Sequence, residues 1–247
     1  MGMKRAERLI ATMPWLDQTA DLLQKVFAPF VGEKAPRELK DTLVGTWLGH
    51  PLHPAVVALP IGAWTSALAL DLAGEERAAD LTIALGMGGA LVSAVTGAAQ
   101  WQDAAYDEQP KRLGALHALT NIAATACYGA SLALRKSGAR PAGVAFSLAG
   151  FGLITVGGHL GGDLAYDLGI GVDHTAFEHP PDDWVEVMDE AELAEGKPVA
   201  VNAKGVKVML VRTAGTIRAV AATCPHLAGP LNKGKIDGDT VTCPWHG

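Results

Sequence analysis

The sequence is poor in cysteine, in charge and in aromatic residues. Its 247 residues include three cysteines, 19% charged residues and 6% aromatic residues. Three cysteines cannot supply the disulfide framework of a small secreted domain. The low charge, together with 49% hydrophobic residues and a positive mean hydropathy, argues against a purely soluble chain. The formal net charge of −6 disfavours nucleic acid as a partner, because nucleic-acid binding needs a basic surface.

The N-terminal part also lacks an export signal. No long apolar run follows a basic start, and Lys4-Arg5 is not a twin-arginine pair. Residues 1–48 are mixed instead, and apolar residues recur among charges at helical spacing between Arg5 and Phe30. We therefore predict one or two amphipathic helices in this segment. They either lie at a membrane interface or pack as ordinary soluble helices.

Four long apolar stretches dominate residues 49–170. They run over about 52–72, 81–99, 113–134 and 142–158. Each is about long enough to cross a hydrocarbon core of roughly 30 Å as a helix. Because short connections join them, we expect an antiparallel bundle of four transmembrane helices. Asp71 is expected at a helix end, where its charge can reach the membrane interface.

Small residues mark the expected interior of this bundle. Gly89, Ser93 and Gly97 follow one another at four-residue spacing in the second stretch, and Gly150 and Gly157 recur in the fourth. Small side chains on one face let helices approach closely, so these faces are predicted to pack inward.

Four histidines accompany the bundle. The motif G-H-P-L-H-P at 49–54 supplies His50 and His53, which both precede proline and are therefore expected in extended or turn backbone. His117 lies near the start of the third stretch and His159 at the end of the fourth. Alternating helix directions bring all four to the same membrane face. Converging histidines could ligate a b-type haem or a metal ion, could line a quinol pocket, or could simply bond loop backbone and water.

The G-H-P-L-H-P motif and the four-helix pattern resemble an uncharacterised family of bacterial membrane domains with four helices. The resemblance covers about residues 45–175. It implies the fold of this part of the chain, and no activity.

The composition of the chain changes after a linker, residues 171–182, that contains Pro180-Pro181. Short β-branched segments separated by turn residues follow and predict a small antiparallel β domain over 183–247. The expected strands are Trp184–Met188, Pro198–Asn202, Val206–Val211, Ile217–Ala221 and Asp239–Thr242.

Two short boxes near the C-terminal end carry the strongest chemical signal. C-P-H-L-A-G-P-L at 224–231 contains Cys224 and His226, and C-P-W-H-G at 243–247 contains Cys243 and His246. Two thiolates on one iron and two imidazoles on the other suit a [2Fe–2S] cluster. Two Cys and two His also make a zinc set, although zinc sites more often open with C-x2-C. A third reading is a pair of unrelated surface loops.

The boxes resemble the Rieske family, whose pattern is C-x-H followed by C-x-x-H. The resemblance covers about residues 183–247 and implies that Cys224, His226, Cys243 and His246 hold the cluster. Gly229 and Trp245 stand where respiratory Rieske proteins carry an extra cysteine pair, so the boxes are more similar to ferredoxin-type members. Family members continue past the second box with a serine and further strands, which implies that the C-terminal part of the domain is missing here.

These observations predict an electron-transfer component rather than a complete enzyme. The expected protein is a multi-pass cell-membrane protein that carries single electrons, with the β domain on the cytoplasmic side. Its expected partners are the lipid bilayer and an electron donor or acceptor that is a protein or a quinone. Two alternatives stay open: a membrane-anchored redox or iron sensor, and a fragment of a Rieske-type oxygenase system.

Overall fold

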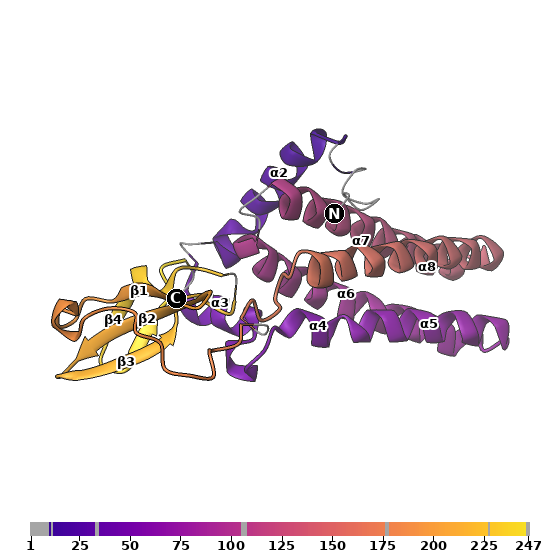
Figure 1. The fold of residues 1–247 in the computed structure, drawn as a ribbon. Coiled ribbons are helices and arrows are strands. Elements are labelled where there is room, and N and C mark those ends of the chain that lie inside the picture. Colours follow the sequence, from indigo (N-terminus) through magenta and orange to yellow (C-terminus); the bar gives the residue numbers. More distant parts are fainter. Residues whose placement is uncertain are drawn as a thin grey trace. The chain divides into compact units, whose positions relative to one another are not determined.

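The computed structural model describes residues 10, 12–32, 35–104, 108–175, 178–226 and 228–245, with 103 and 104 described by backbone alone. The chain forms two compact units, Met1–Leu168 and Gly169–Gly247. In the described residues the first unit is helical, and the strands lie in the second (Figure 1). The predicted change from helices to strands is therefore confirmed.

All four apolar stretches form helices, shown side by side in Figure 1. The first is divided into α4 and α5, and the fourth continues into one turn of π-helix, η2. Their bounds are α4 Leu52–Val56, α5 Ala58–Leu72, α6 Glu76–Ala104, α7 Glu108–Lys136, α8 Arg140–Gly162 and η2 Asp163–Asp167. Several helices extend beyond the apolar stretches, because charged residues at their ends continue the same backbone hydrogen bonding.

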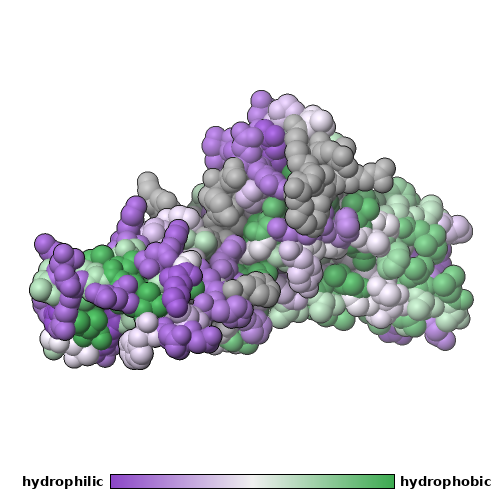
Figure 2. Space-filling model, in the orientation of Figure 1, coloured by the Kyte–Doolittle hydropathy of each residue, from purple (hydrophilic) through white to green (hydrophobic). Residues whose placement is uncertain are grey.

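Among the described residues, three segments are long and apolar enough to cross a membrane: Leu52–Leu72, Glu76–Gln102 and Arg140–Asp167. Helix α7 has a similar length but carries Lys111 and Arg112 near its start and Asn121 near its middle. The side of the bundle visible in Figure 2 is largely apolar. Many large apolar side chains on these helices are exposed, among them Leu59, Ile61, Leu81, Leu85, Leu91, Ile122, Phe146, Leu148 and Val156. An apolar patch of this extent on a soluble protein is rare, and lipid is its natural neighbour.

The small residues face the bundle interior as predicted. A Cβ on Gly89 would come within 3.0 Å of Leu59, and one on Gly150 would lie 2.8 Å from the Tyr128 ring. That ring stacks on Trp64 with centroids 4.1 Å apart. These close approaches explain why glycine stands at both positions.

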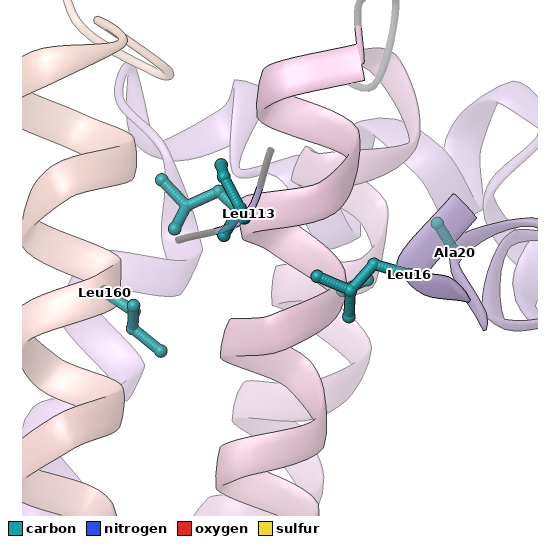
Figure 3. Close-up of a cluster of buried hydrophobic side chains, with 6 residues drawn as sticks. Leu16, Ala20, Leu113 and Leu160 are labelled. Carbon is teal, nitrogen blue, oxygen red and sulfur yellow. The ribbon is translucent and has the colours of Figure 1, made fainter. Parts of the chain in front are cut away.

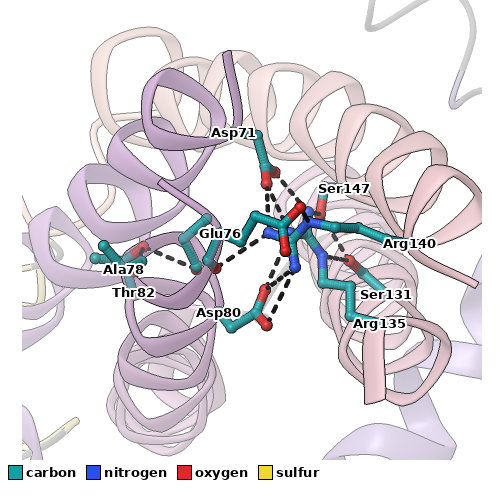
Figure 4. Close-up of polar contacts among 10 residues, drawn as sticks. Asp71, Glu76, Ala78, Asp80, Thr82, Ser131, Arg135, Arg140 and Ser147 are labelled. Carbon is teal, nitrogen blue, oxygen red and sulfur yellow. Dashed lines mark hydrogen bonds and ion pairs between the residues drawn. The ribbon is translucent and has the colours of Figure 1, made fainter. Parts of the chain in front are cut away.

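One end of the bundle holds a buried network of charges (Figure 4). Asp71 from the end of α5 and Asp80 from α6 meet Arg135 from the end of α7 and Arg140 from the start of α8. The Asp71 side chain is only 5% exposed. We expected its charge to reach the interface, and it is neutralised inside the protein instead.

The N-terminal segment contains helix α2, Trp15–Val31, and the shorter helix α3, Arg37–Val44. Helix α2 is amphipathic: Leu16 and Ala20 are buried in a cluster with Leu113 of α7 and Leu160 of α8 (Figure 3). Asp17 pairs with Arg112 at 2.8 Å on the same side. The predicted helical character is confirmed for this part, and residues 5–9 lie outside the described residues.

The second unit contains a three-stranded antiparallel sheet and a separate hairpin. The strands are β1 Val199–Ala203, β2 Val206–Thr213, β3 Thr216–Ala221, β4 Lys235–Asp237 and β5 Thr240–Thr242. Positive φ angles at both Lys204 and Gly205 give the β1–β2 loop the backbone of a type I′ turn, and Ala214 and Gly215 repeat it between β2 and β3.

The strand predictions were confirmed for the segments that overlap β1, β2, β3 and β5, each of which pairs with another strand. The prediction for Trp184–Met188 was wrong, because this segment is not a strand, pairs with no strand among the described residues, and leaves Trp184 fully exposed. Strand β4 was not predicted, because its three residues, Lys-Ile-Asp, offer too short a pattern to recognise.

Candidate functional site

The first Cys-His box is a closed loop that follows β3. Thr223 and Pro230 pair as an antiparallel bridge, and Leu231 N–H donates to the Ala222 carbonyl at 2.8 Å. Inside this bridge, Cys224 N–H donates to the Gly229 carbonyl at 2.8 Å, and Ala228 N–H donates to the Cys224 carbonyl at 2.9 Å. The loop therefore has a fixed backbone, from which Cys224 and His226 project.

The second box begins where β5 ends. Cys243 follows Thr242 directly and is buried, with 8% exposure. A Cβ added to Gly229 would lie 2.9 Å from the Cys243 sulfur and 3.2 Å from the Trp245 ring. The two boxes are therefore neighbours in space, and only glycine at 229 lets the first loop lie this close to the thiol of the second.

The donor set fits a mixed-ligand iron-sulfur centre. Cys243 is buried, and Cys224 and His226 are half-buried. His246 lies outside the described residues. Within the described part of the chain, no group of three or more His, Cys, Asp or Glu side chains could hold a metal ion. Cys224, His226 and Cys243 therefore do not form such a group by themselves in the described part.

The start of the expected linker is attached to the first box. His174 N–H donates to the carbonyl of Pro225, the residue between Cys224 and His226, at 2.9 Å. Just before it, the Asp173 carboxylate accepts hydrogen bonds from the hydroxyl and the backbone N–H of Thr175. These bonds lower the pKa of Asp173 and fix the turn that presents His174.

Two of the four bundle histidines come together. The His53 and His117 rings lie with their centroids 6.5 Å apart and their planes at 84°. His53 comes from α4 and His117 from α7. Both are half-buried, and the Nδ1 atom of each lies against a backbone carbonyl of a neighbouring helix, Ser93 in α6 or Gly157 in α8.

The other two histidines do not join this pair. His50 is exposed, with Nδ1 3.1 Å from the Pro51 carbonyl. His159 is 77% exposed in its side chain and lies 3.8 Å from Asp163. It stands two residues beyond Gly157, which packs against α7, and two residues along a helix is about half a turn. His159 therefore points away from the face that meets His117.

The backbone at His53 also differs from the prediction. His53 lies within the first turn of α4 although Pro54 follows it. Proline lacks only an N–H that the first turn leaves unpaired, so the helix can begin at Leu52. The turn carries His53 inward. The position of His159, about half a turn from Gly157 along the same helix, can be read from the sequence. It would have excluded His159 from the pair.

Two family models match the chain. Residues 49–174, about half of the chain, match a family described as Predicted membrane protein (DUF2231). Residues 183–247 match the Rieske [2Fe-2S] domain. No solved structure matches the chain.

Curated relatives match over short segments. The oxygenase component of 3-ketosteroid-9-alpha-monooxygenase from Mycolicibacterium smegmatis is 41% identical over 55 residues, which cover 22% of this chain and 14% of the relative. Apoptosis-inducing factor 3 from Homo sapiens is 39% identical over 74 residues, which cover 28% of this chain and 12% of the relative. The chain thus spans about an eighth of the length of these relatives. By its match over residues 49–174 the chain belongs to the predicted membrane protein family DUF2231, and at its C-terminal end it carries a Rieske domain, which binds a [2Fe–2S] cluster.

Proposed function

We propose that this chain is a membrane-anchored, ferredoxin-type Rieske protein that carries single electrons to or from a redox partner. The observation that carries the proposal is the contact between the two boxes, where Gly229 of the first loop lies against the Cys243 thiol of the second. When bound, a mixed-ligand [2Fe–2S] cluster accepts and releases one electron at a time.

Each box would supply one thiolate and one imidazole to the cluster. In this proposal the Cys224 and Cys243 thiolates bind one iron, and the His226 and His246 imidazoles bind the other. Cys243 is a buried residue, which limits the access of water to the cluster on this side. The closed loop around Cys224 limits the movement of its ligands, which lowers the reorganisation that accompanies electron transfer. Trp245, half exposed beside Gly229, borders the same loop.

The membrane part is proposed to cross the bilayer four times. Helix α7 is less apolar than the other three, but it is packed between α6 and α8 and buries Ala124, Tyr128 and Ser131. A helix whose polar residues face other helices needs less hydrophobicity to span. We place the Rieske domain on the cytoplasmic side, where ferredoxin-type clusters serve soluble partners.

The similarity to monooxygenase components favours one alternative, a part of an oxygenase system. An oxygenase also needs a mononuclear iron, commonly held by two His and a carboxylate. No such three-residue group occurs among the described residues. The shared segment is 14% of the M. smegmatis protein, which suits a common electron-carrying part and favours an oxygenase or a similar enzyme as the electron acceptor.

The test is spectroscopy of the full chain purified in detergent. Visible and low-temperature EPR spectra are recorded before and after dithionite. We expect a signal that appears on reduction with an average g below the free-electron value. Cys224→Ser should abolish it, and Cys127→Ser, a matched change at the cysteine inside α7, should preserve it. A colourless protein that contains zinc would overturn the proposal.

A further inference from the structure

The His53–His117 pair lies in the membrane unit and has no part in holding the iron-sulfur cluster. The two residues come from helices that are separated in sequence by the whole of α5 and α6. Their side chains nevertheless meet, with ring centroids 6.5 Å apart. Ionisable side chains inside a membrane bundle are costly, and such residues typically mark functional sites.

The hydrogen bonds of the pair fix the tautomer of each ring. His53 Nδ1 lies 3.0 Å from the Ser93 carbonyl oxygen, and His117 Nδ1 lies 2.9 Å from the Gly157 carbonyl oxygen. A carbonyl can only accept, so Nδ1 carries the proton in both rings. In each neutral imidazole the lone pair is therefore on Nε2. This pattern, with Nδ1–H bonded to backbone and Nε2 left as a donor of electrons, is typical of metal-ligating histidine.

The two Nε2 atoms are not occupied by strong hydrogen bonds. Nothing in the described part of the chain bonds to His53 Nε2. The Asn121 amide nitrogen is 3.3 Å from His117 Nε2 and 3.4 Å from Nδ1, which are long distances for a hydrogen bond. Its firm bond, at 2.8 Å, goes to the His117 carbonyl.

Glycines fix the position of both rings. A Cβ on Gly97 would lie 2.8 Å from His53 Cε1, and a Cβ on Gly161 would lie 3.1 Å from His117 Cε1. Gly157 similarly makes room for Asn121, at 2.8 Å from its side chain. Each imidazole thus rests on a helix backbone and is hydrogen bonded to it. Such preorganisation is what a coordination site requires of its ligands.

The separation of the rings sets what can lie between them. A metal–imidazole bond is about 2.0 Å, and adding the distance from each nitrogen to its ring centre gives roughly 6 Å between two rings that hold one metal from opposite sides. The observed 6.5 Å is close to this value. We propose that His53 and His117 bind one transition-metal centre through their Nε2 atoms, a site separate from the iron-sulfur cluster.

Two sources of this centre share the same chemistry. Because no group of three or more such ligands occurs among the described residues, the remaining coordination positions need donors from outside the chain. Porphyrin nitrogens would supply them for a haem iron, and water would supply them for a bare ion such as Zn²⁺ or Cu²⁺. Bis-imidazole coordination is common to both.

The experiment uses the full chain carrying Cys224→Ser and Cys243→Ser, which removes the cluster and its iron. This background is titrated with haemin, with Zn²⁺ and with Cu²⁺, and bound metal is counted per chain. We expect one equivalent of one probe. A Soret band identifies haem, and metal without that band identifies a bare ion. His53→Ala and His117→Ala should each lower the affinity at least tenfold.

His50→Ala and His159→Ala are the matched controls, because these histidines are exposed and lie outside the pair. They should bind like the background. Each change is also placed in the chain with intact cysteines, where a retained EPR signal of the cluster and a monodisperse detergent complex show that the protein folds. If His117→Ala misfolds, His117→Gln replaces it. Binding of no probe, or binding that survives both pair substitutions, would overturn the proposal and leave the iron-sulfur function untouched.

Discussion

The two ends of the helical bundle both gather polar side chains, but they satisfy them differently. At one end Arg135 makes five hydrogen bonds, one for each of its N–H groups, to Asp71, Asp80, Ser131 and Ser147. At the other end His53 and His117 each use Nδ1 on a backbone carbonyl and keep a lone pair on Nε2. Because every N–H donor of Arg135 is used, its network contributes to stability and offers no donor to a ligand. The histidine pair keeps the Nε2 lone pairs and can bind a ligand.

The two ends of the helical bundle also differ in how deeply their ion pairs are buried. The Arg135 side chain is fully buried and Asp71 is 5% exposed, so their charges interact in a low dielectric and depend on each other. The ion pair near the histidines, Asp17 with Arg112, is 32% and 14% exposed. Solvent screens that pair, and its contribution is correspondingly small.

The largest predicted effect is at the end that holds Arg135. Arg135→Met removes the main partner of the buried Asp71 carboxylate and should cost about 3–5 kcal/mol of unfolding free energy, the usual penalty of an uncompensated buried charge. Denaturant unfolding of the detergent-solubilised protein measures it. Arg140→Met, a matched change at the more exposed arginine, should cost less.

The double variant Arg135→Met with Asp71→Leu decides the cause of that loss. It removes both charges and should recover most of the stability, because an apolar pair of similar volume replaces the ion pair. A double variant as unstable as the single one would mean that Arg135 acts through packing, and the contrast between the two ends would lose its electrostatic basis.

Gly143 and Gly97 lie at the two different ends of the bundle and form a matched pair for substitution. A Cβ on Gly143 would lie 2.7 Å from Arg135 Cγ and 2.9 Å from the Ser131 backbone carbonyl, whereas the nearest atoms to a Cβ on Gly97 belong to the His53 ring. Backbone cannot move aside, so Gly143→Ala should cost about 1–3 kcal/mol in thermal unfolding. Gly97→Ala should cost less and should instead weaken metal binding at the histidine pair.

Gly152→Ala is the control for helix propensity. Gly152 lies in α8 like Gly143, and a Cβ there meets nothing within 4 Å. Alanine is the better helix former by roughly 1 kcal/mol, so this variant should be as stable as the parent or slightly more stable. Equal losses at 143 and 152 would contradict the steric explanation.

The smallest effect is expected from the more exposed ion pair, Asp17 with Arg112. The hydrogen bond from Arg112 lowers the pKa of Asp17. A lowered folded-state pKa contributes stability above the unfolded value of about 3.9, and this contribution is lost as the pH falls through the folded value. Asp17→Asn should therefore reduce stability slightly at pH 7 and leave it unchanged at the lowest pH. Unfolding curves recorded from pH 7 to strongly acidic pH test the slope.

Local patterns predicted most of the fold. Apolar length identified the helices, and turn residues such as Lys204-Gly205 identified the first hairpin. The Cys-His boxes were recognisable because ligand spacing within a loop is a local property. The ion pair between Arg135 and Asp71 was not predicted. The two residues are 64 apart in sequence, and no local pattern around either one indicates its partner.

The arrangement of the four bundle histidines was predicted only in part. Helix direction placed His50, His53, His117 and His159 at one end of the bundle, but direction says nothing about which way a side chain points. The structure brings only His53 and His117 together, since His159 is half a turn away from the packed face and His50 precedes the helix.

Pulsed EPR of the dithionite-reduced full chain tests whether two thiolates and two imidazoles hold the cluster. We expect hyperfine coupling to two nitrogen nuclei of comparable strength. Cys127→Ser should leave both couplings in place. A reduced cluster with no strongly coupled nitrogen would contradict the claim, because it would assign all four ligand positions to donors other than His226 and His246.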